Sequence, residues 1–313
     1  MRPLPRHHAT AVAILIVVAV VFGCGFAAMQ TALRGGLSVG AAISLRFTMG
    51  AAGLWVLLRL NKTEVDRRSL LDGTVLGFLL VAIFWLQTDG LRFTTSAKSG
   101  LITSLYVPFT PLLAVILRDR VKISHALGAI LATFGLVMLV HVPGEHLWSG
   151  WNRGDFETFL CAIICTFHVT YTAKFSRRSN AWVLAFTQVA ITGGLSAIIT
   201  AFLPAPNGFQ SAPGALHDPA VLLALGIMVL LVTVFGFWGM SAMQAYLSAT
   251  EASVIFSLEP VTATFIGVYW MGEHFSRLQE LGAALIVAAM LTAELLPRVV
   301  VRVWPEEMDK AAD

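Results

Sequence analysis

The side chains of this sequence that could do chemistry are the few ionisable ones within its long apolar segments. They are Arg46, Lys98, His168, Glu251 and Glu259. An ionisable side chain at the centre of a membrane helix costs roughly 2.5–3.5 kcal/mol on insertion scales, so it marks a candidate for binding or proton coupling. Glu259 precedes Pro260, which removes a backbone donor and loosens the preceding turn. The Glu259 carboxyl group can carry a proton or bind a substrate ammonium, and a structural pairing with Arg46 is equally open.

Arg46 and His168 each have a functional and a structural interpretation. Arg46 lies early in the second apolar segment, where its guanidinium can bind a substrate carboxylate through two parallel hydrogen bonds. A fixed pairing with a buried acid, or a reach toward the interface, is the alternative. His168 can line a polar pocket or proton path, or it can be a hydrogen-bonded packing residue. Cys161, Cys165 and His168 share a helical face, but no pattern supplies ligands from other helices, so we expect no metal and no cofactor.

Lys98 and Glu251 stand at matching positions at the start of two similar apolar segments. Both can simply lie at the membrane interface, Lys98 with Ser96 and Ser99 beside it. The alternative is that they are gate residues, whose charges face a central cavity from opposite sides of the membrane. Deeper aromatic and amide residues are candidates for a pocket wall: Phe22, Trp85, Gln87, Tyr106, Tyr171, Gln188, Trp238 and Gln244.

The composition requires that membrane helices position these side chains. The chain has 313 residues, of which 57% are hydrophobic and 12% are charged. A soluble protein carries about 25% charged residues, so a soluble enzyme is excluded. The net charge of +3 is too small to indicate nucleic-acid binding. Zincin, P-loop and nucleophile-elbow motifs are also missing from the sequence, so we expect no enzyme.

Ten segments are apolar enough, at about 20 residues each, to cross a membrane as helices. They cover approximately 11–31, 39–59, 70–91, 97–117, 123–142, 155–174, 180–203, 219–243, 250–271 and 279–297. With the N-terminus in the cytoplasm, 15 Lys and Arg residues fall on the cytoplasmic side, five fall outside and Arg46 lies within a segment. Because positive charge accumulates in cytoplasmic loops, we expect ten spans with both termini cytoplasmic. The first apolar run is longer than a signal-peptide core, so it is expected to be an uncleaved helix.

An internal repeat divides the chain into two units, residues 1–150 and 151–313. KSGLITSLYV (Lys98–Val107) matches EASVIFSLEP (Glu251–Pro260) at an interval of 153 residues, and LGAIL (Leu127–Leu131) matches LGAAL (Leu281–Leu285) at 154. Each unit then contains five spans, and an odd number makes the second unit enter the membrane from the opposite side. The sequence therefore predicts an all-α membrane protein built from two inverted five-helix repeats, a pattern typical of secondary transporters.

The sequence resembles the drug/metabolite transporter superfamily, specifically proteins with two EamA-type domains. The resemblance covers the whole chain and is carried by FGCGFAAMQ (Phe22–Gln30), by LRF (Leu45–Phe47), and by two long stretches, Leu91–Leu117 and Leu247–Leu295. The chain departs from the family pattern at Phe22, where a tryptophan is usual, and at Asp119, where the glutamate of a Gly-Glu pair is usual. The resemblance implies export or exchange of small metabolites, often amino acids or related amphipathic compounds, across a bacterial inner membrane.

The expected function is therefore a secondary transporter that works by alternating access, with a proton gradient as the first candidate energy source. Its partners would be a small-molecule substrate and the lipid bilayer, and the protein could be a monomer or a homodimer. Two alternatives stay open. One is a membrane-embedded enzyme acting on lipid, and the other is a membrane accessory protein that does not transport.

Overall fold

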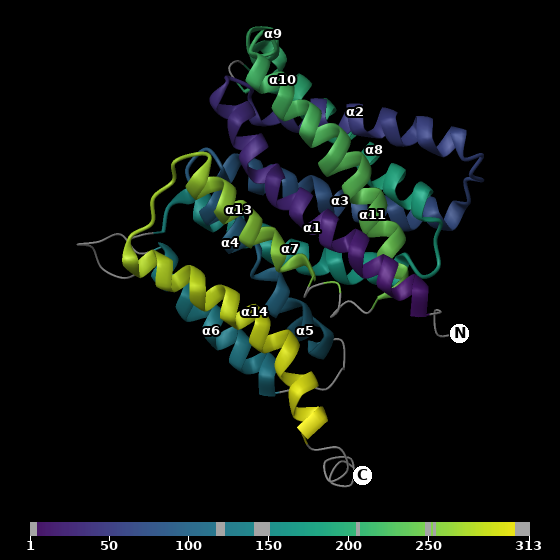
Figure 1. The fold of residues 1–313 in the computed structure, drawn as a ribbon. Helices are drawn as coiled ribbons and strands as arrows, with labels where there is room; N and C mark the ends of the chain where they lie inside the picture. The colour runs from purple at the N-terminus through teal and green to yellow at the C-terminus, as the bar shows by residue number, and fades with distance from the viewer. Residues whose placement is uncertain are drawn as a thin grey trace.

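The computed structural model describes residues 5–116, 123–140, 151–204, 207–247, 252 and 255–303. Within these residues the chain is all-α and contains no strand. The candidate gate residue Glu251 and the loop residue Asp119 lie outside the described residues. Figure 1 shows the helices crossing one another in a bundle.

Each of the ten segments that the hydropathy predicts contains at least one described helix. In the first half they are α1 (Pro5–Arg34), α2 (Val39–Leu60), α3 (Arg67–Gly90), α4 (Ser96–Thr103), α5 (Tyr106–Ile116) and α6 (Ile123–Val140). The second half begins with α7 (Arg153–Phe175), α8 (Ala181–Phe202), η1 (Phe209–Ser211), α9 (Ala212–Ala215) and α10 (Pro219–Gly226). It continues with η2 (Ile227–Phe235), α11 (Gly236–Met243), η3 (Gln244–Tyr246), α13 (Leu258–Tyr269) and α14 (Arg277–Val303).

Six helices in the described part of the chain are each long and apolar enough to cross a membrane. They cover His8–Arg34, Val39–Leu60, Arg67–Gly90, Arg153–Phe175, Ala181–Phe202 and Pro219–Tyr246. The protein is therefore a multi-pass membrane protein, and ten spans stay a prediction.

Short polar residues begin several of these helices. The side chains of Ser38 and Asp66 accept hydrogen bonds from backbone N–H groups in the first turns of α2 and α3. Asn152 and Asp155 form a reciprocal capping box at the start of α7. Because the first turn of a helix has N–H groups without partners, such side chains fix where a helix starts.

The fourth predicted span is two helices rather than one. α4 ends at Thr103, Ser104 and Leu105 form a turn, and α5 begins at Tyr106. Pro108 lies in the first turn of α5, where its missing N–H costs least, and it cannot donate to the carbonyl of Ser104 as a continuous helix would require. Ser257, which is 153 residues after Ser104, likewise forms a turn directly before α13. The repeat thus places a helix break at the same position in each half.

The eighth predicted span contains a nine-residue π-helix, η2, between α10 and α11. Gly226 and Gly236 flank it. A Cβ added at Gly236 would lie 2.3 Å from the ring of Phe22, so glycine lets α1 approach the end of η2. π-Helical turns are rare and frequent at functional sites.

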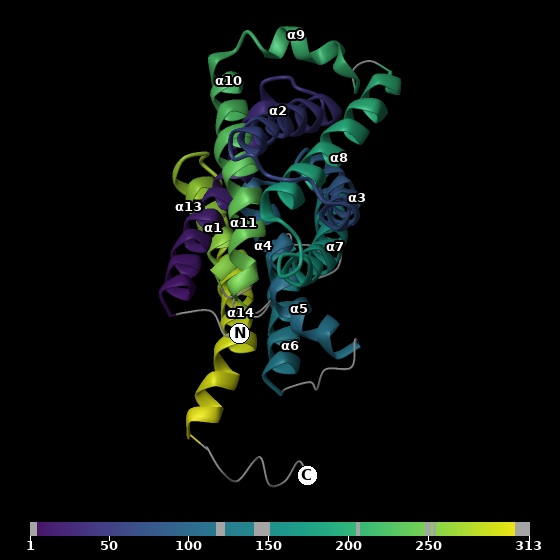
Figure 2. The same cartoon turned by 90° about the vertical axis from the view of Figure 1, so that its right-hand side faces the viewer.

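Equivalent helices of the two halves make similar packing contacts. α6 and α14 lie side by side along one flank of the molecule (Figures 1 and 2). Gly135 contacts Ile286, and Gly282 contacts Leu139, so these two helices are antiparallel. α1 packs against α13 in the second half, as α7 packs against α4 and α5 in the first. The central helices are thus held mainly by partners from the opposite half.

Small residues make the close approaches between α3 and α8. Gly73 faces Thr187, and Gly77 faces Ile191, at separations that leave no room for a Cβ. This confirms that the spacing Gly73-x-x-x-Gly77 marks a helix-packing surface, as small residues do in membrane helices.

Candidate functional site

A cavity of about 90 Å³ is lined by residues of both halves. Its polar and ionisable wall residues come from α2, α3, α4, α5, α7 and α13: Arg46, Gln87, Thr103, Tyr106, Cys165, His168 and Glu259. The rest of the wall is apolar and includes Phe22, Phe26 and Met29 of α1. The cavity thus combines an apolar lining with a few converging polar groups, as small-molecule sites do.

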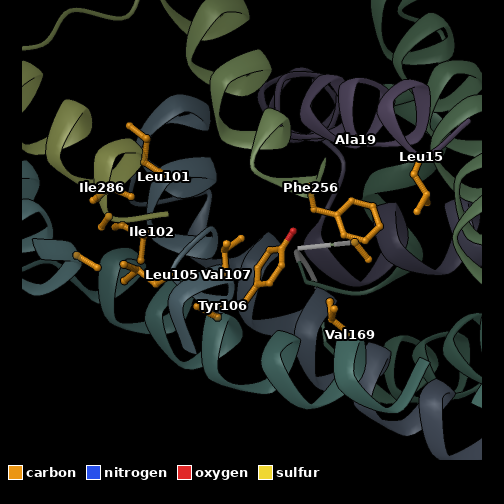
Figure 3. Close-up of a cluster of buried hydrophobic side chains, with 14 of the residues drawn as sticks. Leu15, Ala19, Leu101, Ile102, Leu105, Tyr106, Val107, Val169, Phe256 and Ile286 are labelled. Atoms are coloured by element: carbon orange, nitrogen blue, oxygen red, sulfur yellow. The ribbon is translucent and has the colours of Figure 1, made fainter. Parts of the chain in front are cut away.

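Tyr106 and Glu259 meet across the cavity. The Tyr106 hydroxyl donates a hydrogen bond of 3.2 Å to Glu259 Oε2. These residues are 153 positions apart, the same interval that separates the repeated motifs, so they are equivalent residues of the two halves. Figure 3 shows the Tyr106 hydroxyl directed toward Phe256, which lies directly before the Ser257 turn. Gly23 of α1 packs against the backbone of Glu259. A Cβ added at Gly23 would lie only 2.5 Å from the Glu259 carbonyl oxygen, so a larger residue would not fit.

Arg46 is a buried cation that none of the described ion pairs includes. Its side chain is 3% exposed, and its Nε donates to Thr233 Oγ1 of η2 at 3.0 Å. The guanidinium carbon lies 4.8 Å and 4.6 Å from the ring centroids of Phe47 and Phe84. Cation–π contact stabilises the charge, while the remaining N–H donors have no acceptor among the described residues. Because Arg46 lines the cavity, these donors are available to an anionic group there.

His168 lines the cavity and also belongs to a buried hydrogen-bond chain. Its Nε2 lies 3.0 Å from Gln188 Oε1, and Gln188 Nε2 donates to Ser241 Oγ at 3.1 Å. Gln188 does not line the cavity and instead fixes the imidazole from behind. Since the Gln188 amide nitrogen donates to Ser241, its oxygen accepts a hydrogen bond from the Nε2–H of His168.

The other predicted pocket residues divide between the cavity and packing contacts. Phe22 is in the cavity wall, 5.6 Å from the Phe237 ring and 6.1 Å from the Phe256 ring. Four residues lie elsewhere: Trp85 donates to Ser196 Oγ at 3.0 Å, Trp238 stacks on Trp182, Tyr171 stacks on Phe175, and Gln244 is fully buried. Hydropathy places all of them at depth, but helix rotation decides which face the cavity.

Lys98 is bound in an ion pair that joins the two halves. Its Nζ lies 2.8 Å from Asp155 Oδ2, and Thr94 Oγ1 donates to Asp155 Oδ1 at 3.0 Å. The Asp155 side chain is fully buried. Sequence reasoning did not single out Asp155, although the capping-box spacing from Asn152 to Asp155 was a visible signal.

Glu273 is a second buried acidic residue whose carboxylate binds across the two halves. Its carboxylate accepts from the backbone N–H groups of Ser96 (2.9 Å) and Ala97 (3.0 Å) and from Ser96 Oγ (2.6 Å). It therefore caps the N-terminus of α4, where the helix dipole favours negative charge. The loop between α13 and α14 thus holds the half-helix that leads toward Tyr106.

Ion pairs also join helix ends on the two opposite sides of the cavity. On the side of Lys98, Asp89 pairs with both Arg92 and Arg153. At the other side, Arg178 pairs with Asp72, and Ser179 donates to the same carboxylate at 2.7 Å. The hydrogen bond to Asp72 holds the pKa of the Arg178 guanidinium above its ordinary value. Each pair joins positions that the charge distribution assigns to one side of the membrane.

Comparison with known proteins agrees with this architecture. The chain is similar to an uncharacterized transporter of Archaeoglobus fulgidus, with 29% identity over 72% of this chain and 68% of the relative. It is also similar to the uncharacterized transporter YdfC of Bacillus subtilis, with 22% identity over 78% of each chain. A solved structure described only as the crystal structure of a protein covers 94% of this chain and 99% of its own length, with 20% identity and a TM-score of 0.65, which shows a shared fold.

The model of the EamA-like transporter family matches the chain twice, at residues 9–141 and 152–293. The two matches lie in succession and together cover most of the 313 residues. The chain therefore belongs to the EamA-like transporter family and is a membrane transporter with two such repeats.

Proposed function

We propose that this protein is a secondary transporter that exports or exchanges small amphipathic metabolites such as amino acids. The observation that carries the proposal is the cavity lined by both halves, whose polar wall holds one buried cation and one buried carboxyl group. In the proposed topology, residues 1–150 and 151–313 form inverted repeats, and both termini are cytoplasmic at a bacterial inner membrane.

The cavity suits a zwitterion with an apolar side chain. Arg46 would bind a carboxylate through its free N–H donors, with its Nε held by Thr233. Glu259 would bind the ammonium group, and Tyr106 would orient the carboxylate by its hydrogen bond. The phenylalanine-rich wall would contact the apolar part of the substrate. Charge complementarity at two points would favour zwitterions over simple amines or acids.

Glu259 is also the proposed site of proton coupling. A carboxyl group that binds either a proton or an ammonium group makes the two mutually exclusive, and such competition couples opposite fluxes. His168, in the same wall, would be a second proton-binding group. Facilitated exchange without protons is the alternative outcome of the experiment below.

Alternating access would need a contact on each side of the cavity that holds the two halves together, here called a lock. The pairs Lys98–Asp155 and Asp72–Arg178 lie on opposite sides. We propose that the first is a gate, because it joins α4 of one half to α7 of the other, and the second would restrain α3 against the loop after α7. Rocking of one half against the other would break one lock at a time.

The test is flux in liposomes that contain the purified chain alone. The 20 standard amino acids are loaded singly, and their release is measured with and without a pH gradient. We expect release of at least one amphipathic amino acid by wild-type protein, and loss of that release in Glu259→Gln and Arg46→Ala at unchanged protein content. Wild-type release by both variants would remove these residues from the mechanism, and no release of any amino acid by wild-type protein would refute the substrate class.

A further inference from the structure

A group of buried polar side chains near the end of α7 has no role in the cavity. Thr172 and Gln244 are fully buried, and Ser176 is 6% exposed. The hydroxyls of Thr172 and Ser176 and both amide atoms of Gln244 have no hydrogen-bond partner among the described residues. An unpaired buried polar group costs about 1–3 kcal/mol, so a set of four such atoms requires an explanation.

These side chains lie further along the same helices than the hydrogen-bond chain that starts at His168. Thr172 and Ser176 follow His168 at intervals of four residues, so the three lie on one face of α7, each about 6 Å further along the helix axis. Gln244 follows Ser241 by three residues, so it lies one turn beyond the Gln188–Ser241 hydrogen bond.

The elements that carry these side chains pack against each other. α7 packs against η3, which Gln244 begins, and Arg177 Nη2 donates to the carbonyl oxygen of Leu247 at 3.2 Å directly after η3. Arg177 is exposed. Polar residues therefore recur along α7 from His168, in the cavity wall, to Arg177 at the surface, and η3 packs beside this helix.

We propose that this series is a hydrated path, in which water bound to Thr172, Ser176 and Gln244 connects His168 and the cavity with the surface at Arg177. Buried water typically makes about three hydrogen bonds to polar groups that otherwise lack partners, and these side chains supply such groups. The path reaches the surface beside the Asp72–Arg178 ion pair, so it would give water-sized species access to that side of the cavity while both ion pairs stay intact.

The use of this path by protons rests on the proposed function, since only a proton-coupled transporter needs it. The titratable and charged groups that share the cavity with His168 are Glu259, Arg46, Tyr106 and Cys165. Water that reaches His168 from the Arg177 side would let these groups exchange protons with that side only.

The test uses full-length protein in which Cys24, Cys161 and Cys165 are replaced by alanine. Thr172→Cys, Ser176→Cys and Gln244→Cys are introduced singly, and Ag⁺, a thiol-reactive ion of about the size of water, is added to inside-out or right-side-out vesicles. Thiols that remain are counted with a fluorescent maleimide after denaturation. The matched control is Thr187→Cys, because Thr187 is also buried without a partner but faces Gly73 of α3 instead of the path.

We expect Ag⁺ to block the three path cysteines at least tenfold faster than Thr187→Cys, and only from the face that carries Arg177. Adding Gln244→Leu should slow the block of Thr172→Cys at least tenfold, because leucine removes both amide groups. Equal rates at Thr172→Cys and Thr187→Cys, or reaction only from the opposite face, would overturn the path. Because the labelling involves no substrate, its result is independent of whether the liposome experiment detects flux.

Discussion

Tyr106 and Glu259 are equivalent residues of two repeats, and they hydrogen bond to each other at the centre of the protein, with 3.2 Å between the hydroxyl and Oε2. Each follows a turn that interrupts a helix, at Ser104–Leu105 and at Ser257. In the proposed inverted-repeat topology, a contact between equivalent positions places both close to the pseudo-twofold axis that would relate the halves. At such a point small relative rotation of the halves changes the contact with little displacement of either helix.

The Tyr106–Glu259 contact can be measured by a double-mutant cycle. Tyr106→Phe and Glu259→Gln each remove or weaken the same hydrogen bond, so their effects on thermal stability in detergent should not add. We expect a coupling free energy of about 1 kcal/mol, within the range of 0.5–3 kcal/mol for residues in contact. Trp85→Phe, which removes a hydrogen bond to Ser196 outside the cavity, should instead be additive with Glu259→Gln. Additivity of Tyr106→Phe with Glu259→Gln as well would show that the Tyr106–Glu259 bond contributes nothing measurable.

Arg46 should be sensitive to a change that keeps its charge. Lysine cannot form two parallel hydrogen bonds with a carboxylate, so Arg46→Lys should reduce flux of any carboxylate substrate at least tenfold. Thr233→Val removes only the acceptor of the Nε–H, and we expect a smaller reduction. The measurement is initial release from liposomes. If Arg46→Lys transports like wild-type protein while Arg46→Ala does not, only the positive charge matters.

Removal of Lys98 should destabilise the protein more than removal of the whole Lys98–Asp155 pair. Lys98→Met leaves a buried carboxylate without its cation, which typically costs about 3–5 kcal/mol. Lys98→Met combined with Asp155→Asn removes both charges, and asparagine can still accept at the start of α7. The double variant should therefore melt at a higher temperature than Lys98→Met alone. The reverse order would mean that the pair does not hold α4 against α7.

The approach of α3 to α8 makes Gly77 intolerant of a methyl group. A Cβ at Gly77 would lie 2.6 Å from the Cβ of Ile191, with no flexible chain end between them. Gly77→Ala should cost about 1–3 kcal/mol by overpacking. Gly194 in α8 has no atom within 4 Å of such a Cβ, so Gly194→Ala should be neutral or stabilising. The comparison is made by thermal unfolding of both purified variants.

The sequence by itself determined the class of protein, the approximate helices and the repeat. Hydropathy depends on composition along the chain, so it located α1, α2 and α3 without knowledge of their neighbours. The interval of 153 residues already related Tyr106 to Glu259, and the scarcity of charge directed attention to Arg46 and Glu259. The sequence also indicated Gly73 and Gly77 as packing residues, because small residues at that spacing recur where helices meet.

Only the tertiary structure decided which polar residues share the cavity. Gln87 and Gln188 are both mid-helix amides, yet one lines the cavity and the other supports His168 from behind. Their roles depend on how each helix is rotated about its axis, and that rotation is set by packing against other helices. The same holds for Asp155 and Glu273, whose partners are 57 and 177 residues away in sequence. Local pattern reports periodicity and depth, whereas contacts between distant segments follow from the packing of the whole chain.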